Sequence, residues 1–480
     1  MDRSALPDAA FVDPSGGNAA AVESLASDVV DQLLEALASA EDRPPLPSDP
    51  TPLDATVPEH PRGDDAIEEA VGRIVDGSMN PAHPGYVGHM DTIPTTVSML
   101  GDLVAAGVNN NMLSAEMSPI LSELEHALTE TVAGAFGLGP DAGGVLAAGG
   151  SLANLQALAV ARNRAFDVAD AGVDARGGRP VAFASEAAHT SLRKAAMLLG
   201  LGTDAIVPVD TDSNGRMRPD ALEDAVTEAV AAGRRPFCVV GTAGTTTTGN
   251  VDPLDDLASV AARRDLWFHV DAAYGGALAF APDRRHLLEG VERADSVTFN
   301  PQKWCYVAKT CAMALFADRD VLVEDFRIGA PYMRADEARP NLGEVSVQGT
   351  RHADVLKLWL TFQHLGRSGL NALVEESYRL SAHVREAVAT RPALELATEP
   401  ETNVVCFRAA PDWCEPDAYD ELNDALQASL LAHADAFVSL PTYRGSEWLR
   451  TVLLNPYTGV ETLDGLFEHV DAFLATRRPE

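Results

Sequence analysis

The chain has 480 residues, of which 46% are hydrophobic, and it carries 71 acidic against 36 basic residues, for a formal net charge of −35. A chain this long and this apolar can bury a core, and it has no uninterrupted apolar run of about 18 residues, which argues against overall disorder and against a membrane-spanning helix. The negative charge argues against nucleic acid and anionic membranes as partners, because both would repel the protein.

An acidic segment opens the chain. Residues 22–37 place apolar side chains at helical spacing, which predicts an amphipathic helix, and a proline-rich stretch from Pro44 to Pro61 follows it. An isolated helix of this kind cannot bury its apolar face, so we expect residues 1–85 to pack on a partner subunit or on the main body; a solvated leader is the alternative. No basic region followed by an apolar stretch opens the sequence, so we expect a cytoplasmic protein.

Short apolar runs alternate with alanine-rich helical stretches between residues 86 and 370. This alternation predicts an α/β domain built on a mostly parallel sheet with right-handed crossovers. Helical periods cover residues 152–166 and 218–233. The predicted strands are residues 144–148, 180–184, 205–208, 237–241, 267–270, 296–299 and 312–316.

The last part of the chain, residues 371–480, mixes helical and strand patterns. Helices are expected around residues 370–389 and 418–434, and short strands at 403–409 and 447–454. We therefore expect a smaller α+β domain after the large one.

Two motifs that follow predicted strands carry groups suited to a phosphorylated, planar ligand. Gly149, Gly150 and Ser151 form a glycine turn that leads into a helix, where backbone amides and a hydroxyl make an anion site. His189 follows the next strand, where an imidazole can stack on a ring or transfer a proton. Each signal is weak alone, since glycine turns are common and a lone histidine is usually structural.

Two further strand ends carry a carboxylate and an amine. Asp271 and Ala273 lie two residues apart, on the same side of a strand, where a carboxylate could pair with a protonated ring nitrogen; a metal ligand or a helix cap is the alternative. Lys303 follows a strand in Asn-Pro-Gln-Lys-Trp, and an ordinary loop lysine is the alternative. A phosphate site, a stacking histidine, a carboxylate and a lysine together fit pyridoxal 5′-phosphate, which needs an amine for its aldehyde and a carboxylate for its ring nitrogen.

The sequence resembles the pyridoxal-phosphate-dependent group II amino-acid decarboxylases, the family of the glutamate, diaminobutyrate, cysteine-sulfinate and aromatic-amino-acid decarboxylases. The resemblance implies the fold type I (aspartate-aminotransferase-like) architecture, with a seven-stranded, mostly parallel sheet and a homodimer whose active sites lie at the subunit interface. It is carried by the motifs at residues 83–90, 109–125, 149–162, 185–196, 241–254, 269–276 and 300–304.

The resemblance implies a role for each motif residue. Lys303 binds the aldehyde of the cofactor covalently, and Asp271 pairs with its ring nitrogen. His189 stacks on one face of the ring, and Ala273 packs against the other. The same resemblance assigns the remaining cofactor contacts, with the phosphate held by Ser151, the Leu152 amide and Asn300, and with Thr246 near the ring oxygen or the substrate carboxylate.

Two positions around the lysine concern proton transfer. Many members of the family have histidine directly before the lysine, but this chain has Gln302, which can hydrogen-bond but cannot titrate. The family uses a loop tyrosine to protonate Cα, and Tyr332 stands at the matching position in a stretch punctuated by glycine and proline. An ordinary loop aromatic is the alternative for Tyr332.

The segments that match the family's side-chain pocket are polar in this chain and contain no phenylalanine or tryptophan. An aromatic substrate would need apolar or stacking walls, so we expect a short polar or charged substrate: L-2,4-diaminobutyrate, glutamate or aspartate. Acids without an obvious basic partner tilt the prediction toward diaminobutyrate, although these groups could equally cap helices and never touch substrate. The candidate pocket residues are Asp91, Thr92, Asn109, Asn111 and Glu116.

Three alternatives stay open for the function. An aromatic-amino-acid decarboxylase would differ only in its pocket. Another fold-type-I reaction, such as transamination, would share the cofactor site. A non-catalytic cofactor-binding protein is a third class, which the intact set of Lys303, Asp271 and His189 disfavours. No motif predicts a metal site.

The basic residues are almost all arginine. Lysine occurs only at positions 194, 303, 309 and 357, so 32 of the 36 basic residues are arginine. A large acidic excess with few lysines is typical of proteins from a high-salt cytoplasm, where salt screens repulsion among carboxylates, so we expect a halophilic protein; simple acidity is the alternative.

Overall fold

The computed structural model describes residues 6–48, 51–173, 177–329, 331, 333 and 339–479. The chain divides into two compact units. The larger comprises His89–Asp424 and Leu440–Pro456, and the smaller comprises Met1–Gly88, Ala425–Ser439 and Tyr457–Glu480. The expected boundaries near residues 85 and 370 stay a prediction.

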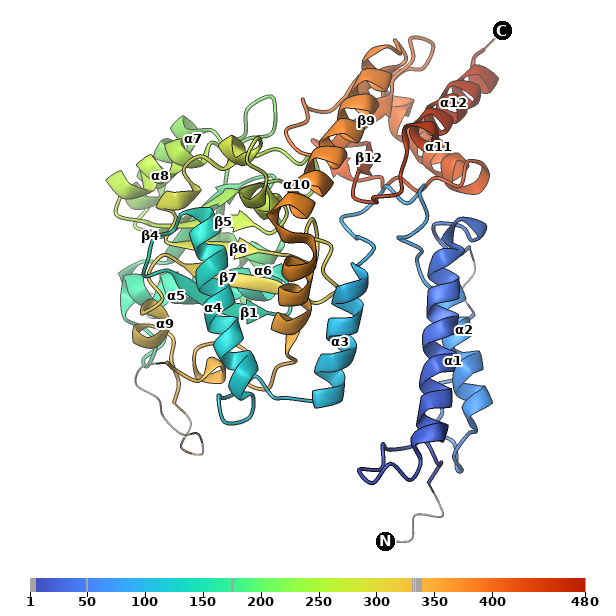
Figure 1. Ribbon diagram of the computed structural model, residues 1–480. Helices are drawn as coiled ribbons and strands as arrows, with labels where there is room; N and C mark the ends of the chain where they lie inside the picture. The colour runs from blue at the N-terminus through green and yellow to red at the C-terminus, as the bar shows by residue number, and fades with distance from the viewer. Residues whose placement is uncertain are drawn as a thin grey trace. The chain divides into compact units, whose positions relative to one another are not determined.

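A seven-stranded sheet forms the centre of the larger unit (Figure 1), in the order β1-β7-β6-β5-β4-β2-β3. The pairs of β2 with β3 and β4, of β4 with β5 and of β5 with β6 are parallel, whereas β7 is antiparallel to both neighbours. This confirms the predicted mostly parallel sheet. Its strands are β1 (Gly143–Ala147), β2 (Pro180–Ser185), β3 (Ile206–Val209), β4 (Arg235–Thr242), β5 (Trp267–Ala272), β6 (Ser296–Phe299) and β7 (Ala312–Phe316).

The strands read as apolar runs because helices cover the sheet. Every residue of β1, β2, β6 and β7 is buried, as expected for a sheet with both faces covered. The helices of this unit are α3 (Thr96–Val108), α4 (Pro119–Phe136), α5 (Gly150–Phe166), α6 (Ser191–Leu198), α7 (Pro219–Ala231), α8 (Leu254–Arg263), α9 (Val321–Glu324) and α10 (Asp354–Ala389).

A second, three-stranded antiparallel sheet belongs to the same unit. It has the order β12-β9-β8 and comprises β8 (Leu394–Leu396), β9 (Val404–Ala409) and β12 (Leu449–Val452). A two-stranded ribbon, β10 (Thr442–Tyr443) with β11 (Ser446–Glu447), precedes β12.

Helix α10 is broken at Gly366, which has φ of 59° and ψ of −179°. This backbone conformation is accessible essentially only to glycine, so the helix consists of two rods joined at one residue. The first rod packs on α3 so closely that a Cβ on Gly101 would lie 2.8 Å from the Cα atom of Lys357.

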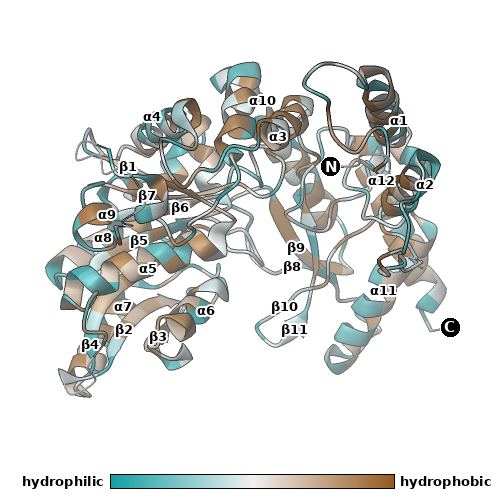
Figure 2. Ribbon diagram, turned by 90° about the horizontal axis from the view of Figure 1, so that it is seen from below, coloured by the Kyte–Doolittle hydropathy of each residue, from teal (hydrophilic) through white to brown (hydrophobic). Residues whose placement is uncertain are grey.

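The other face of α3 is apolar and exposed. Leu100, Leu103, Val104 and Val108 retain 52%, 61%, 49% and 52% of their accessible surface, and Figure 2 shows the hydropathy of the helices. An exposed apolar stripe of this kind is typical of a protein interface.

The smaller unit contains α1 (Ala19–Ala38), α2 (Asp64–Asp76) and α12 (Val460–Arg477), and α11 (Tyr419–His433) runs into it from the larger unit. Helix α1 confirms the amphipathic helix expected at residues 22–37, and it has no buried residue. Among the described residues, no helix is both long and apolar enough to cross a membrane.

Candidate active site

The predicted site residues converge at one edge of the seven-stranded sheet. The parallel strands β2, β4, β5 and β6 end at this edge, which is where open α/β sheets bind ligands. A cavity opens there, lined by polar groups from several strand ends. Its walls are formed by Ala148, Gly149, Gly150, Ser151, Asn154, His189, Ser191, Thr242, Gly244, Thr246, Asp271, Ala273, Tyr274, Asn300, Gln302 and Lys303.

A chain of hydrogen bonds fixes the buried Asp271 carboxylate. Asn154 on α5 donates from Nδ2 to Asp271 Oδ2 at 2.8 Å, and the Ala273 amide donates to Asp271 Oδ1 at 3.1 Å. Asn154 Oδ1 in turn lies 3.0 Å from Nε2 of His269, and His269 Nδ1 lies 2.8 Å from the Ser296 hydroxyl. The carboxylate therefore points into the cavity with both oxygens held.

The protonation of His269 follows from its burial. Loss of hydration lowers the pKa of His269 to about 4, so the ring is neutral at pH 7. Because Asn154 Oδ1 can only accept, the His269 proton lies on Nε2, and Nδ1 accepts from Ser296. Asn154 and His269 were missed in the sequence, because an asparagine inside a helix and a histidine inside a strand have no distinctive local pattern.

Lys303 faces the same cavity from the turn after β6. Its amide donates to the Asn300 carbonyl at 3.0 Å, and its Nζ lies 5.9 Å from the centre of the Tyr274 ring. Burial lowers the pKa of Lys303, against the opposing effect of Asp271. A lowered pKa makes more of the amine neutral, which is the form that attacks an aldehyde.

His189 lies at the rim of the cavity. The Ser191 amide donates to His189 Nδ1 at 3.2 Å, and the residue lines the cavity. Loss of hydration lowers the pKa of His189, while Asp271 raises it. Ala273 also lines the cavity, so both residues expected to contact the ring faces are brought to it.

The glycine turn between β1 and α5 fits an anion. A Cβ on Gly150 would lie 2.8 Å from the Asn300 side chain, so only glycine leaves room here. With its amide oriented to satisfy its neighbours, Asn300 accepts from the Gly150 amide at 3.2 Å. Ser151 lines the cavity at the start of α5, whereas the Leu152 amide donates to the Gly149 carbonyl at 3.1 Å, and its contact with a phosphate stays a prediction. Room for a planar ring between an amine, a carboxylate and a helix N-terminus fits pyridoxal phosphate.

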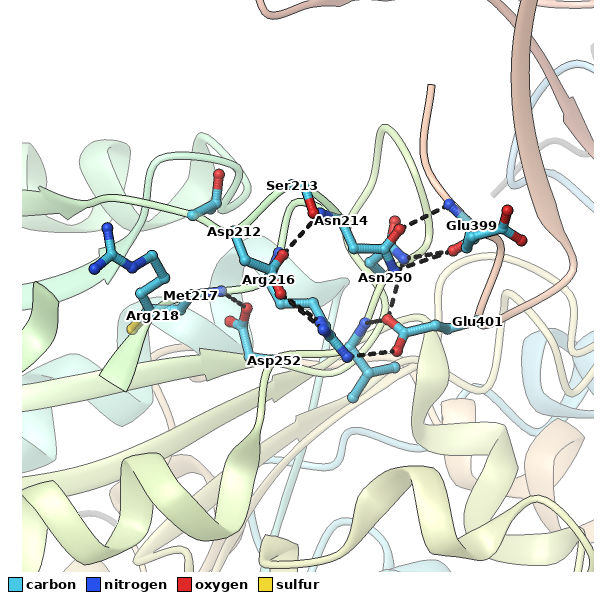
Figure 3. Close-up of polar contacts among 12 residues, drawn as sticks. Asp212, Ser213, Asn214, Arg216, Met217, Arg218, Asn250, Asp252, Glu399 and Glu401 are labelled. Carbon is cyan, nitrogen blue, oxygen red and sulfur yellow. Dashed lines mark hydrogen bonds and ion pairs between the residues drawn. The ribbon is translucent and has the colours of Figure 1, made fainter. Parts of the chain in front are cut away.

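The loop that carries Thr246 is braced by a polar network (Figure 3). Asp252 accepts from the Met217 amide at 2.7 Å and from the Thr242 amide at 2.8 Å. Glu401, in the connection between β8 and β9, accepts from the Val251 amide and from Asn250 Nδ2, both at 3.0 Å. The loop from residue 242 to residue 252 is thus held from two sides.

A buried arginine reaches the same loop. Arg450 on β12 donates to the Thr246 carbonyl at 2.5 Å and lies 3.2 Å from His89 Nδ1. Its positive charge is close enough to lower the pKa of Lys303.

The five predicted pocket residues do not line this cavity as the described part of the chain forms it. Asn109 caps α3 in a left-handed conformation, Glu116 is exposed, and Asn111 accepts from the Leu113 amide at 3.0 Å. Asp91 forms an ion pair with Lys309, and Thr92 follows it. The expectation that these acids lack a basic partner is therefore wrong for Asp91. Its partner, Lys309, lies 218 residues away in the sequence, and only the fold brings the two together.

Two further expectations concern the lysine turn and the loop. The side chain of Gln302 accepts from the Cys311 amide at 2.6 Å, so it holds the turn that begins at Lys303. Tyr332 lies outside the described residues, and its role stays a prediction.

Comparisons with known proteins agree with this geometry. The pyridoxal-dependent decarboxylase conserved domain matches residues 47–410. The acidic amino acid decarboxylase GADL1 of Mus musculus is 29% identical over 419 residues, which cover 83% of this chain and 75% of that protein. The L-2,4-diaminobutyrate decarboxylase of Rhizobium meliloti (strain 1021) is 33% identical over 430 residues, covering 88% and 84%. A crystal structure of Oryza sativa TDC with PLP and tryptamine has a TM-score of 0.90 and 25% identity, covering 98% of this chain and 100% of that one.

Proposed function

We propose that this chain, a member of the pyridoxal-dependent decarboxylase family, removes the α-carboxylate of a short polar or charged L-amino acid. Membership of the family makes it an amino-acid carboxy-lyase that uses pyridoxal 5′-phosphate. Glutamate, aspartate and L-2,4-diaminobutyrate are the candidates. The observation that carries the proposal is the meeting of Lys303, Asp271 and His189 around one cavity. The names of two relatives, an acidic amino acid decarboxylase and an L-2,4-diaminobutyrate decarboxylase, support a short charged substrate.

Each residue then has a defined task. When bound, pyridoxal phosphate supplies an electron sink, which would accept the electron pair of the bond between Cα and the departing carboxylate. Asp271 holds the proton on the ring nitrogen, and Asn154 keeps that carboxylate oriented. Lys303 attaches the aldehyde through its amine, and Tyr332 is the proposed acid that protonates Cα.

The lining of the cavity supports the proposed contacts with the cofactor. His189 would cover one face of the ring, and Ala273 would pack against the other. Ser151, the Leu152 amide and Asn300 would hold the phosphate, and Thr246 would lie beside the ring oxygen or the substrate carboxylate.

We further propose a cytoplasmic, salt-adapted homodimer. The exposed apolar stripe of α3 and the absence of buried residues in α1 support an interface with a second copy. The acidic excess of the sequence supports a high-salt environment.

The test is CO2 release by the cofactor-loaded protein in molar salt. Glutamate, aspartate and L-2,4-diaminobutyrate are compared with tyrosine, tryptophan and DOPA, and we expect CO2 from at least one of the first three and little from the aromatic amino acids. Lys303→Ala should lose both CO2 release and the absorbance of the protein-bound cofactor. Preference for an aromatic substrate would overturn the substrate class, and a persisting absorbance in the variant would overturn the assignment of Lys303.

A further inference from the structure

We propose that Lys309, held in place by Asp91, binds the negatively charged side-chain group of the substrate, so that the enzyme selects short amino acids with a second carboxylate or a similar small anion. This inference rests on the proposed function. It names the residue that selects among the candidate substrates. It favours an acidic amino acid, whereas the sequence alone slightly favoured diaminobutyrate.

The turn that carries Lys309 begins at Lys303 and is fixed to its surroundings. The Cys311 amide donates to the side chain of Gln302 at 2.6 Å, which closes the turn behind Lys309. On the near side, the Ala308 amide donates to Ser98 Oγ at 2.7 Å. Lys309 therefore extends from a backbone that is anchored both before and after it.

A second segment brings Asp91 to the same place. The Thr95 amide donates to the Tyr306 carbonyl at 2.8 Å, which joins the start of α3 to the turn after Lys303. Asp91 lies four residues before this bond and pairs with Lys309 Nζ. The ion pair thus links two segments that are distant in sequence and that meet at the turn after Lys303.

The pair lies within electrostatic reach of the reacting amine. Asp91 raises the pKa of Lys303, whereas Lys309 and Arg450 lower it. The same three charges act on the pKa of His89. The geometry places two of them near the cavity: Arg450 donates to the carbonyl of Thr246, and Lys309 lies in the turn that begins at Lys303, and Thr246 and Lys303 both line the cavity.

Lys309 keeps capacity to bind a further anion. Its side chain is 44% exposed, and its ammonium has three N–H donors. The ion pair with Asp91 is made to one carboxylate oxygen, which leaves donors for a second anion. As an exposed ion pair it contributes little to folding stability, which leaves a binding role as the better reason for its presence. Lysine is also rare in this chain, with arginine used at 32 of the 36 basic positions.

Charge decides which side chain fits. A substrate with a side-chain carboxylate meets the ammonium of Lys309, and its α-carboxylate has Arg450 as a second cation in this region. A substrate with a side-chain ammonium would have to share Asp91 with Lys309, and it would be repelled by both Lys309 and Arg450, the two cations set against this one acid. The region therefore favours an acidic amino acid over a diamino acid.

The experiment compares Lys309→Met with Lys309→Arg, Asp91→Asn and the control Arg263→Met, all loaded with pyridoxal phosphate in molar salt. Arg263 forms an exposed ion pair with Glu223 and lies outside the site, so the control removes one surface cation from a similar pair. Steady-state CO2 release is measured with aspartate, glutamate, L-2,4-diaminobutyrate and uncharged L-2-aminobutyrate.

We expect the unmodified enzyme and Arg263→Met to prefer an acidic substrate. Lys309→Met should lower kcat/KM for the acidic substrates, relative to that for 2-aminobutyrate, by about 10- to 100-fold, the range for loss of a hydrogen bond to a charged group. The same variant should gain activity on diaminobutyrate, because Asp91 is then unpaired by Lys309. Lys309→Arg should retain the preference for acidic substrates, and Asp91→Asn should lower KM for them.

Three results would overturn the inference. Preference of the unmodified enzyme for diaminobutyrate would do so while leaving the proposed decarboxylation standing. An equal loss by Lys309→Met on all substrates, with Lys309→Arg equally impaired, would assign Lys309 a structural role instead. Absence of CO2 from every amino acid, with the cofactor fully bound, would overturn the proposed function itself.

Discussion

At the scale of single residues, the orientation of Asp271 depends on partners that belong to three different elements. Asn154 comes from α5, His269 from β5 and Ser296 from β6, and their hydrogen bonds leave only one arrangement of donors and acceptors. A buried carboxylate that must stay ionised beside a ring nitrogen gains from such a fixed environment, because both oxygens keep their partners before the ligand binds.

We predict that Asn154→Ala impairs the site more than the fold. The substitution removes the bond to Asp271 Oδ2 and leaves the Nε2 proton of His269 without its acceptor, each worth about 1 to 3 kcal/mol when buried. Cofactor affinity, measured by fluorescence titration, and kcat should both fall by about tenfold or more.

A matched control exists on the same helix. Asn163 is also buried on α5, but its side chain donates to the Asp325 carbonyl at 2.7 Å, outside the cavity. Asn163→Ala should lower thermal stability with unchanged cofactor affinity. Equal losses of affinity in the two variants would contradict a specific role for Asn154.

The sequence allowed the candidate site residues near strand ends to be predicted, but not the residues that hydrogen-bond to them. Asp271, His189 and Lys303 could be predicted because each lies within a recognisable motif at or shortly after the end of a buried strand. Asn154 and His269 lie inside regular elements, where their neighbours come from residues more than 100 positions away in the chain. The partner of Asp91 was hidden for the same reason, since Lys309 is brought to it only by the fold.

At the scale of elements, the strands were predictable to within one or two residues because the covered sheet makes each of them a short apolar run. Helix α10 was harder. A helix was expected around residues 370–389, whereas the structure has helical residues from Asp354, with a break at Gly366. The expected start reflects local apolar spacing, but the first rod is defined by its packing on α3.

The loop between β4 and α8 supplies a prediction about pH. Burial raises the pKa of Asp252 from 3.8 to about 7, with Glu401 and Asp212 acting in the same direction and the Met217 and Thr242 amides opposing them. Between these two values the folded chain holds a proton that the unfolded chain has released. The free energy of unfolding contributed by this group therefore falls as the pH rises toward about 7, by at most about 1.4 kcal/mol per pH unit, and levels off above it.

Asp252→Asn should remove this dependence. In urea unfolding at fixed salt between pH 5 and pH 8, the wild-type midpoint should decline relative to that of the variant as the pH rises, because the asparagine side chain of the variant cannot ionise. Midpoints that run parallel over the whole range would show that the carboxyl does not titrate there.

At the scale of the whole molecule, the charge of −35 bears on the conditions under which the proposed dimer would assemble. Two copies brought together double the number of acidic groups in one particle, and salt shortens the range of their repulsion from about 10 Å at 0.1 M to about 3 Å at 1 M. The apolar stripe of α3 provides attraction that does not depend on charge.

We predict that dilution of salt dissociates the dimer and abolishes CO2 release. Light scattering and activity, measured together from molar salt down to about 0.1 M, should fall over the same range. Sucrose in place of salt serves as the control, because it favours compact states without screening charge. Full activity in dilute buffer, or equal protection by sucrose, would refute salt adaptation through charge screening.

The break in α10 also has a mechanical consequence. The rod before Gly366 is held by α3, and the rod after it packs on the three-stranded sheet that bears Arg450. Any change of angle between these two bodies is concentrated at one residue, so a motion that moves Arg450 relative to Lys303 would be a rotation about a single pivot. Gly366 would then be a hinge between the two rods of α10.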